Sequence, residues 1–535
     1  MDPDAVEPDM KRSVSIVMPD DHYPVAPFTQ ILTPLARNAP TTDVAFEAAA
    51  PPPVKKLVYS SVALALLAAS YLGWCLSQLN LSTFHNQADC DARPVKPGTC
   101  LMFPGHSKTE WLFAVNALVI GGMIGAVSSA HISDRFGRKR TLVVNCGTMI
   151  LGAIVQASAP SIPVFAVGRG IAGLASGTAT ALCNGYISEV APPHLRGAFG
   201  SGYGLAIASG IFLVDVTFFF ANTASGWRYI AGFPTVIALT FLFFSRHHMV
   251  ESPSWLILKG RQEEAEQVLA RLYGEEHVIT ALRWIVVKRA GFSQRSLSVN
   301  LSTVPENGTQ LPVYVAQTKQ NTNVSPFKTL MSKRYRIQVL LAIHMALATQ
   351  FTGCNAVFFY SSMLFKTAGA SDGRIGSIVV GTMLMIPNLF VIILTRRFGN
   401  RSMLLFGQGA MFIGSVGLTI ALSLHISGLS IFFIAFYVFS YNIALGPLAY
   451  PTGTSLYPDS IRAAGTSIMM FTNWFGILSI GVGFPYVSAA LGELAFLPFA
   501  VLTVYFIAFM YKFLPNTTGM TNDEIQSLFG PSSRV

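Results

Sequence analysis

The chain has 535 residues, of which 52% are hydrophobic and 12% charged, and its formal net charge is +10. This much apolar surface excludes a soluble globular protein, because one core could not hide it, and predicts an integral membrane protein. The positive charge does not indicate nucleic acid, because the cations stand in loops between apolar runs rather than on one soluble face.

Twelve apolar runs follow one another, each long enough to cross a hydrocarbon layer about 30 Å thick as a helix. They are expected at 57–79, 110–132, 141–159, 162–187, 198–221, 228–247, 337–364, 374–395, 402–425, 428–452, 463–488 and 490–513. Barrel strands would need short segments of alternating apolar and polar residues, which are absent. The expected fold class is therefore an all-α integral membrane protein, since helices satisfy their own backbone hydrogen bonds in lipid.

The runs divide the chain into five parts. The expected domains are a disordered N-terminal segment at 1–55, a six-helix bundle at 56–247, a long loop at 248–336, a second six-helix bundle at 337–513 and a tail at 514–535. Within the loop, GRQEEAEQVLARLYGEE at 260–276 predicts an amphipathic helix, because Val268, Leu269 and Leu272 recur at helical spacing. Residues 293–326 are rich in Ser, Asn, Thr and Gln and are expected to be disordered.

Two similar charged loops predict the orientation in the membrane. SDRFGRKR at 133–140 and TRRFGNR at 395–401 carry an excess of arginine and lysine, which is typical of cytoplasmic loops. With twelve spans, both termini and the loop 248–336 are then also expected to be cytoplasmic, and the sequons at 300 and 307 unglycosylated. The expected location is the plasma membrane.

The six cysteines fall into two groups. Cys75, Cys146, Cys183 and Cys354 lie inside apolar runs, where small buried thiols are the ordinary interpretation. Cys90 and Cys100 share the loop after the first run, on the side expected to face away from the cytoplasm. A disulfide between them and two free thiols both remain open.

An internal repeat relates the two halves of the chain. The charged loop at 133–140 is echoed at 395–401, YISEVAPPHLRG at 186–197 is echoed by TSLYPDSIRAAG at 454–465, and ESPSWL at 251 is echoed by LPNTTG at 514. Three echoes in the same order at nearly the same spacing indicate two halves related by a parallel repeat. Such an architecture places a substrate site between the halves, near the middle of the membrane.

These motifs resemble the major facilitator superfamily and, within it, the sugar porter family that includes the facilitative glucose transporters. The segments that carry the resemblance are GGMIGAVSSAHISDRFGRKR, GRGIAGLASG, YISEVAPPHLRGA, ESPSWL, QFTGCNAVFFYS, FTNWF and LPNTTGMTNDE. The resemblance covers residues 57–525 and implies the major facilitator fold. It also implies facilitative transport of a hexose or related polyol by alternating access.

Neutral amides and aromatic rings are what a sugar site requires, because each hydroxyl both donates and accepts hydrogen bonds. Gln350 and Asn355 fit this need and lie five residues apart, on roughly one face of a helix. The resemblance adds Asn473, Trp474, Tyr450, Phe359 and Tyr360 to the candidate substrate site. The alternatives are that the two amides join helices and that the Phe359–Tyr360 pair packs in a core.

The resemblance also implies a gate of charged side chains on the cytoplasmic side. Its expected members are Arg138, Arg169, Glu189, Arg196 and Glu251 in the first half and Arg397 and Arg462 in the second. Arg396 and Ser455 stand where the family usually has acidic residues, so we expect a weaker gate, with fewer attractive pairs to hold that side shut. The alternative is that these arginines only mark solvated loops.

Three further positions bear on substrate and coupling. Gly204 stands where the family has a glutamine that binds sugar, which leaves room for another or bulkier polyol. Cys75 stands where proton-coupled relatives tend to have aspartate, which favours facilitated transport. Asp215 is an acid inside a span, but it lies about 27 Å from Gly197 along the helix, near the outer interface where we expect water to reach it.

No metal-ligand spacing, nucleophile elbow or phosphate-binding loop is present, so we expect neither an enzyme nor a cofactor or metal site. The expected partners are a small-molecule sugar and the lipid bilayer, without nucleic acid and with proton coupling as the less favoured possibility. The alternatives in function are a proton-coupled sugar symporter and a non-transporting sugar sensor on the same fold. His131 and His344 are expected to make ordinary polar contacts.

Overall fold

The computed structural model describes residues 53–81, 84, 87–290, 326–367, 373–517, 520 and 522–529. All secondary structure in this part of the chain is helical, as the apolar runs predict. Eleven of the described helical segments are long and apolar enough to cross a membrane, and Leu497–Phe513 is a shorter apolar helix. The segments expected to be disordered, 1–55 and 293–326, lie almost entirely outside the described residues, as do the two sequons.

The first half of the bundle contains six spans. They are α2 (Lys56–Ser77), α5 (Lys108–Phe136), α6 (Arg138–Ser158), α7 (Ile162–Val190), α8 (Arg196–Thr217) and the pair α9 (Gly226–Gly232) and α10 (Pro234–His248). Gly137, at φ +101°, separates α5 from α6, and Pro234 is the first residue of α10. The short helix α4 (Gln87–Asp91) lies in the loop between α2 and α5.

The second half repeats this arrangement. Its spans are α15 (Arg336–Phe351) with α16 (Cys354–Thr367), α17 (Gly373–Phe398), α18 (Asn400–Ser423), α19 (Ser427–Ile443) with α20 (Leu445–Ser455), α21 (Asp459–Leu491) and α22 (Leu497–Phe513). The remaining helices lie outside the spans: α11 (Pro253–Leu258), α12 (Gln262–Tyr273), η2 (Glu275–His277), α13 (Val278–Ala290), α14 (Pro326–Leu330), η3 (Gly492–Leu494) and α23 (Asn522–Ser527).

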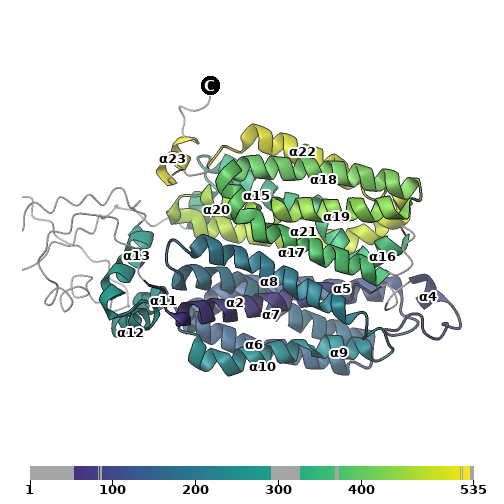
Figure 1. The fold of residues 1–535 in the computed structure, drawn as a ribbon, viewed down its shortest axis with the longest axis horizontal. Helices are drawn as coiled ribbons and strands as arrows, with labels where there is room; N and C mark the ends of the chain where they lie inside the picture. The colour runs from purple at the N-terminus through teal and green to yellow at the C-terminus, as the bar shows by residue number, and fades with distance from the viewer. Residues whose placement is uncertain are drawn as a thin grey trace, which may run out of the picture. The chain divides into compact units, whose positions relative to one another are not determined.

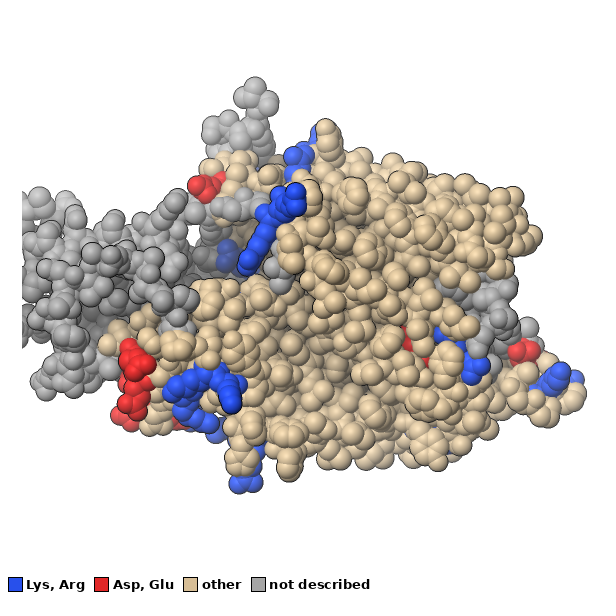
Figure 2. Space-filling model, in the orientation of Figure 1, with Lys and Arg blue, Asp and Glu red and all other residues tan. Residues whose placement is uncertain are grey.

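The two halves meet along two pairs of helices. In Figure 1 the purple-to-teal first half lies against the green-to-yellow second half, with α8 packed on α17 and α21 on α5. Figure 2 shows lysine, arginine, aspartate and glutamate toward the two ends of the visible face, while the middle shows none. An apolar band with charged residues on both sides of it suits a multi-pass membrane protein.

Two names are used below for the ends of the bundle. The charged end is the one with the α5–α6 junction, and the disulfide end is the one with the α2–α5 loop, which contains the disulfide between Cys90 and Cys100.

Helices α5 and α7 lie backbone against backbone in the first half. A side chain added to Gly121 or Gly125 of α5 would overlap a backbone carbonyl of α7, and one added to Gly173 or Gly177 of α7 would overlap a carbonyl of α5. Small residues allow backbones in membranes to approach this closely, and dispersion contacts then hold the pair together. This glycine seam makes α5 and α7 a single packed unit.

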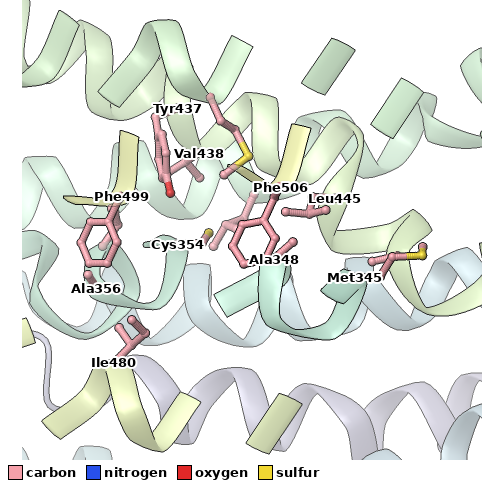
Figure 3. Packing of buried hydrophobic residues seen from close by; sticks show 14 of the residues in the cluster. Met345, Ala348, Cys354, Ala356, Tyr437, Val438, Leu445, Ile480, Phe499 and Phe506 are labelled. Atoms are coloured by element: carbon pink, nitrogen blue, oxygen red, sulfur yellow. The ribbon is translucent and has the colours of Figure 1, made fainter. Parts of the chain in front are cut away.

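The seventh span is broken in the middle. Gly353 has φ +96° between α15 and α16, and an added Cβ would lie 2.7 Å from the ring of Phe499, so only glycine fits here. The Tyr437 hydroxyl donates to the carbonyl of Thr352, one of the groups that the break leaves without a helical partner. Figure 3 shows Tyr437 and Phe499 beside Cys354, the first residue of α16.

A disulfide joins Cys90 and Cys100, which resolves the choice between a bridge and two free thiols. The connection between α2 and α5 that contains this disulfide packs on the first half through Phe84 and Met102, both fully buried. Its backbone is tied by the Met102 amide, which donates to the Phe84 carbonyl at 3.2 Å. The disulfide end of the first half is thus covered by an ordered loop.

Helix α12 lies within the range 260–276, for which a helix is expected, and it docks on the charged end of the first half. Leu269 and Leu272 are buried, and the Tyr273 hydroxyl donates to the Val190 carbonyl at 2.5 Å. Burial raises the pKa of Tyr273, so the hydroxyl keeps the proton that it donates. The Lys55 amide donates to the Leu272 carbonyl at 3.1 Å and adds a second tie.

The break at Gly353 yields a first prediction. Gly353→Ala should lower the apparent melting temperature of the purified protein, because φ +96° costs a residue with a Cβ about 1–3 kcal/mol and the methyl group would also press on Phe499. Gly409→Ala in α18 is the matched control, since nothing lies within 4 Å of its added Cβ. Equal melting temperatures for the two variants would contradict this account.

Candidate substrate site and gate

Three amide side chains meet beside the break in the seventh span. Asn355 Nδ2 donates to Gln350 Oε1, and Gln350 Nε2 donates to Asn473 Oδ1 of α21. Thr349 Oγ1 lies 3.3 Å from the same Asn473 oxygen. Gln350 and Asn355 are buried, with 4% and 6% of their surfaces exposed, whereas Asn473 is partly exposed. The amide cluster is neutral and contains both donors and acceptors.

The break explains why Gln350 and Asn355 contact each other. On a continuous helix, residues five apart point about 140° away from one another. The turn at Gly353 ends α15 and restarts the chain as α16, which brings Asn355 back toward Gln350. The expectation that both lie on one face of a single helix is therefore wrong: the two amides belong to different helices and meet across the break between them.

The aromatic residues of the candidate site do not all lie together: Phe359, Tyr360 and Trp474 belong to one apolar cluster, and Tyr450 packs against another. Tyr360 donates its hydroxyl to the Gly481 carbonyl at 3.1 Å, and the ring centroids of Phe359 and Tyr360 are 6.3 Å apart. Trp474 is 4% exposed and lies against Gly122 of α5, so it contacts the first half. The Tyr450 hydroxyl oxygen is buried and has no hydrogen-bond partner.

Asn388 was not among the expected site residues, although it faces the position where a family glutamine is missing. A Cβ added to Gly204 of α8 would lie 3.0 Å from Asn388 Oδ1 of α17. Asn388 Nδ2 donates to the Leu384 carbonyl at 2.7 Å, and the residue is 7% exposed. A polar residue after Pro387 inside an apolar run is the sequence signal that could have identified it.

The first-half gate residues form a compact cluster at the charged end. Arg138 pairs with Glu189 at 3.1 Å and with Asp134 at 2.9 Å. The Glu251 carboxylate accepts from the backbone amides of Arg138 at 2.7 Å and Lys139 at 2.9 Å, at the start of α6. A carboxylate at a helix N-terminus is stabilised both by these unpaired amides and by the helix dipole.

Two expected gate residues lie elsewhere or bond differently. Arg169 is not in the charged cluster: it is 0% exposed, and its Nη1 donates to the Cys75 carbonyl of α2 at 2.6 Å. It stands 20 residues before Glu189 on α7, which corresponds to about 30 Å along the helix. Arg196 is at the start of α8 and donates to the Ala191 carbonyl at 3.1 Å.

The second-half gate residues contact carbonyls and rings. Arg462 donates to the Tyr457 carbonyl at 3.0 Å, and Arg397 is exposed, with its guanidinium 5.7 Å from the centre of the Phe398 ring. Ser455 donates to the Thr452 carbonyl at 2.7 Å. The two ion pairs of Arg138, with Glu189 and Asp134, lie inside the first half.

Cys90, Cys100 and His106 bring their ligand atoms within 4.8 Å of one another. Both cysteines are consumed by the disulfide and have no thiolate to offer, so this cluster does not fit a metal. His344 makes the ordinary polar contact expected of it, with Nε2 2.8 Å from the Tyr505 hydroxyl and the ring stacked on Phe509.

Comparison with known proteins gives a consistent set of similarities. A family model described as "Sugar (and other) transporter" matches residues 67–529. The human solute carrier family 2, facilitated glucose transporter member 4, is 31% identical over 445 residues, which cover 80% of this chain and 81% of the relative. Member 1 of the same group from Gallus gallus is 31% identical over 443 residues, covering 80% and 84%.

Solved structures share the fold. The xylose transporter XylE from E. coli, in a partially occluded inward open conformation, has a TM-score of 0.69 and 21% identity, covering 87% of this chain and 100% of that chain. The proton:xylose symporter XylE bound to 6-bromo-6-deoxy-D-glucose has a TM-score of 0.67 and 22% identity, covering 88% and 99%. Both likenesses establish the major facilitator architecture.

The Arg138–Glu189 pair yields a second prediction. The two side chains are 15% and 17% exposed, so a double-mutant cycle of Arg138→Gln and Glu189→Gln should give a coupling of about 1 kcal/mol in unfolding free energy. The same cycle on Arg261 and Glu264, which are 37% and 50% exposed, should give a smaller coupling. Thermal or denaturant unfolding in detergent measures both, and the reverse order would contradict the assignment.

Proposed function

Because the chain belongs to the sugar transporter family of the major facilitator superfamily, we propose that it carries a hexose or related polyol across a membrane by alternating access, down the gradient of that sugar. The family is one of transporters rather than enzymes. The relatives named above as facilitated glucose transporters support a sugar of this size.

The amide cluster beside the broken helix is the observation that carries this proposal. Gln350, Asn355 and Asn473 present donors and acceptors without net charge, which suits a ring of hydroxyl groups. In the present state they bond to one another, so a sugar that displaces these contacts replaces them hydrogen bond for hydrogen bond. A small net gain gives the weak binding that a carrier needs, because the substrate must also leave.

The arrangement of the halves supports alternating access. Trp474 of α21 lies against α5, and Phe212 of α8 lies against Gly381 of α17, so contacts between halves run from the middle toward the disulfide end. At the charged end, the carboxylates of Glu189 and Glu251 bond within the first half, to Arg138 and to the backbone amides that begin α6. We place this charged end, with both termini, on the cytoplasmic side of the plasma membrane, because its loops carry the positive excess.

Downhill transport is favoured over proton symport by the surroundings of Arg169. This buried cation bonds to the backbone carbonyl of Cys75, and Cys75 supplies a thiol where a carboxylate would be needed for proton exchange with the arginine. Gly204 supplies no side chain to bind sugar, and the Asn388 amide lies against it instead. This different set of polar groups supports a substrate range that extends beyond glucose to other polyols. Counterflow of labelled glucose, fructose and inositol distinguishes these sugars.

Gln350→Leu yields a third prediction. The variant removes the residue that bonds to both Asn355 and Asn473, so the half-saturation constant for sugar in proteoliposomes should rise about tenfold, the equivalent of one to two hydrogen bonds. Gln408→Leu is the matched control, because this buried amide of α18 contacts Met510 rather than the cluster. Its half-saturation constant should stay unchanged.

The counterflow assay also separates the competing functions. Sugar exchange without a proton gradient supports a facilitator, whereas exchange that requires the gradient supports a symporter. Binding of sugar without any exchange supports a sensor.

An equal effect of Gln350→Leu and Gln408→Leu on the half-saturation constant would overturn the assignment of the amide cluster as the sugar site.

Ser455→Glu yields a fourth prediction. The added carboxylate stands near the start of the loop before α21, where Arg462 bonds to a carbonyl, and gives the second half an acidic gate residue. We expect a larger population open at the disulfide end, because an added attraction favours closure of the charged end. Labelling of a cysteine at the disulfide end measures that population. Ser455→Gln, of similar size but neutral, should leave it unchanged, and no rise in the glutamate variant would contradict the gate.

A further inference from the structure

Asp215 is a carboxyl group buried at the seam between the two halves. It lies in the last turn of α8 and is 1% exposed, so water does not reach it, contrary to the expectation from its depth along the helix. Oδ1 accepts a hydrogen bond from the Ser77 hydroxyl of α2 at 2.6 Å. Oδ2 is buried without a hydrogen-bond partner.

The second half supplies the cover over this carboxyl group. A Cβ added to Gly381 of α17 would lie 3.3 Å from Asp215 Oδ2 and 3.1 Å from the Cα of Phe212. Gly381 thus allows α17 to lie directly on the carboxyl. Ser377, one turn nearer the start of α17, is 0% exposed and its hydroxyl has no hydrogen-bond partner. Polar groups on both sides of the contact are therefore buried, each with an oxygen that has no hydrogen-bond partner in the protein.

The cations near this site bond to other groups. Arg169 of α7 donates to the Cys75 carbonyl, and Arg374 of α17 lies 5.1 Å from the centre of the Phe219 ring. The other ionisable groups in the interior of the helices packed against α8 are neutral when buried: Tyr71 and Cys75 of α2, Cys183 and Tyr186 of α7 and Tyr450 of α20. The remaining ones lie near the opposite, charged end of these helices: Lys56, Tyr59, Glu189, Arg396 and Arg397. An ionised Asp215 would have one hydrogen bond and no hydrogen-bonded cation, which is costly away from water.

We propose that Asp215 is a proton-binding site that is occupied while α17 covers it and that releases its proton when the halves part at the disulfide end. On opening, the O–H bond of the carboxyl group breaks and the proton passes to water on that side, while Ser77 continues to donate to the carboxylate. Closing takes the proton back from the same side. The inference rests on the alternating-access motion of the proposed function.

Because Asp215 exchanges its proton only with water at the disulfide end, the proposal has a specific consequence. No proton crosses the membrane, so sugar transport stays downhill, but the pH at the disulfide end sets how easily that end opens. Acid keeps Asp215 protonated and favours the closed seam. The open state binds fewer protons, so its population rises with pH by up to about tenfold per pH unit for one proton released.

The experiment uses Ser377→Cys as a reporter of seam opening. The full-length protein in oriented proteoliposomes is labelled from the disulfide end with a membrane-impermeant maleimide, and each rate is divided by that of the denatured protein at the same pH. The four native free cysteines are buried, and the signal of the protein without the reporter is subtracted. The normalised rate should rise from about pH 6 to about pH 8, within the tenfold-per-unit limit.

Three variants in the reporter background test the site. Asp215→Asn keeps the shape and the hydrogen bond from Ser77, and it should make the rate independent of pH. Ser77→Ala should keep the response but displace it to higher pH, because the ionised form loses its donor. Glu110→Gln is the matched control at the same end: this exposed residue caps α5, glutamine caps as well, and the response should persist.

Several results would overturn the proposal. They are an unchanged pH response in Asp215→Asn, a response abolished by Glu110→Gln, and a response to the pH on the charged side while the pH at the disulfide end is fixed. Labelling requires no sugar, so it reports on the proton site even if the counterflow assay shows no transport. Conversely, counterflow in Asp215→Asn at one pH tests the proposed function without this site.

Discussion

An interrupted helix inside an apolar bundle must find partners for the backbone groups that the interruption frees, since lipid offers none. In this protein that requirement shapes the seventh span. Gly353 makes the turn, Tyr437 bonds to the freed carbonyl of Thr352, and Phe499 fills the space where a side chain would be. The amide cluster exists because of this break, which turns Asn355 back to Gln350. The most polar part of the second half thus follows from a local backbone constraint.

The two ends of the bundle are built on different chemistry. At the charged end, Arg138 and Glu251 hold the start of α6 with ion pairs and backbone amides, all within one half. At the disulfide end, the halves meet through glycines and through buried polar side chains that keep an atom without a hydrogen-bond partner, such as Asp215 Oδ2 at Gly381. Polar atoms without partners gain hydrogen bonds when water enters. The contact between the halves at the disulfide end is therefore suited to open as well as to close.

The spans, the repeat and the family could be predicted from the sequence, because apolar run length and recurring motifs depend on local residues alone. The motifs also pointed to Gln350 and Asn473, and the structure brings these two side chains into contact, while their binding of sugar stays a prediction. The contact of Asn355 with Gln350 could not, since it depends on a turn at one glycine. Depth along α8 suggested that water reaches Asp215, but burial depends on α17, which lies far away in the chain. Arg169 likewise matched a sequence motif, but the motif does not say where in the bundle this side chain lies, which is away from the charged cluster.

The glycine seam between α5 and α7 has a mechanical consequence. With backbones in direct contact, these helices have few side chains that could change rotamer to absorb a displacement, so the first half is stiff. The second half has breaks at Gly353 and Ala444, where backbone angles depart from the helix and bending is concentrated. The two halves should then deform unequally during transport: the first half moves as a rigid body, and the helices of the second half bend at these breaks.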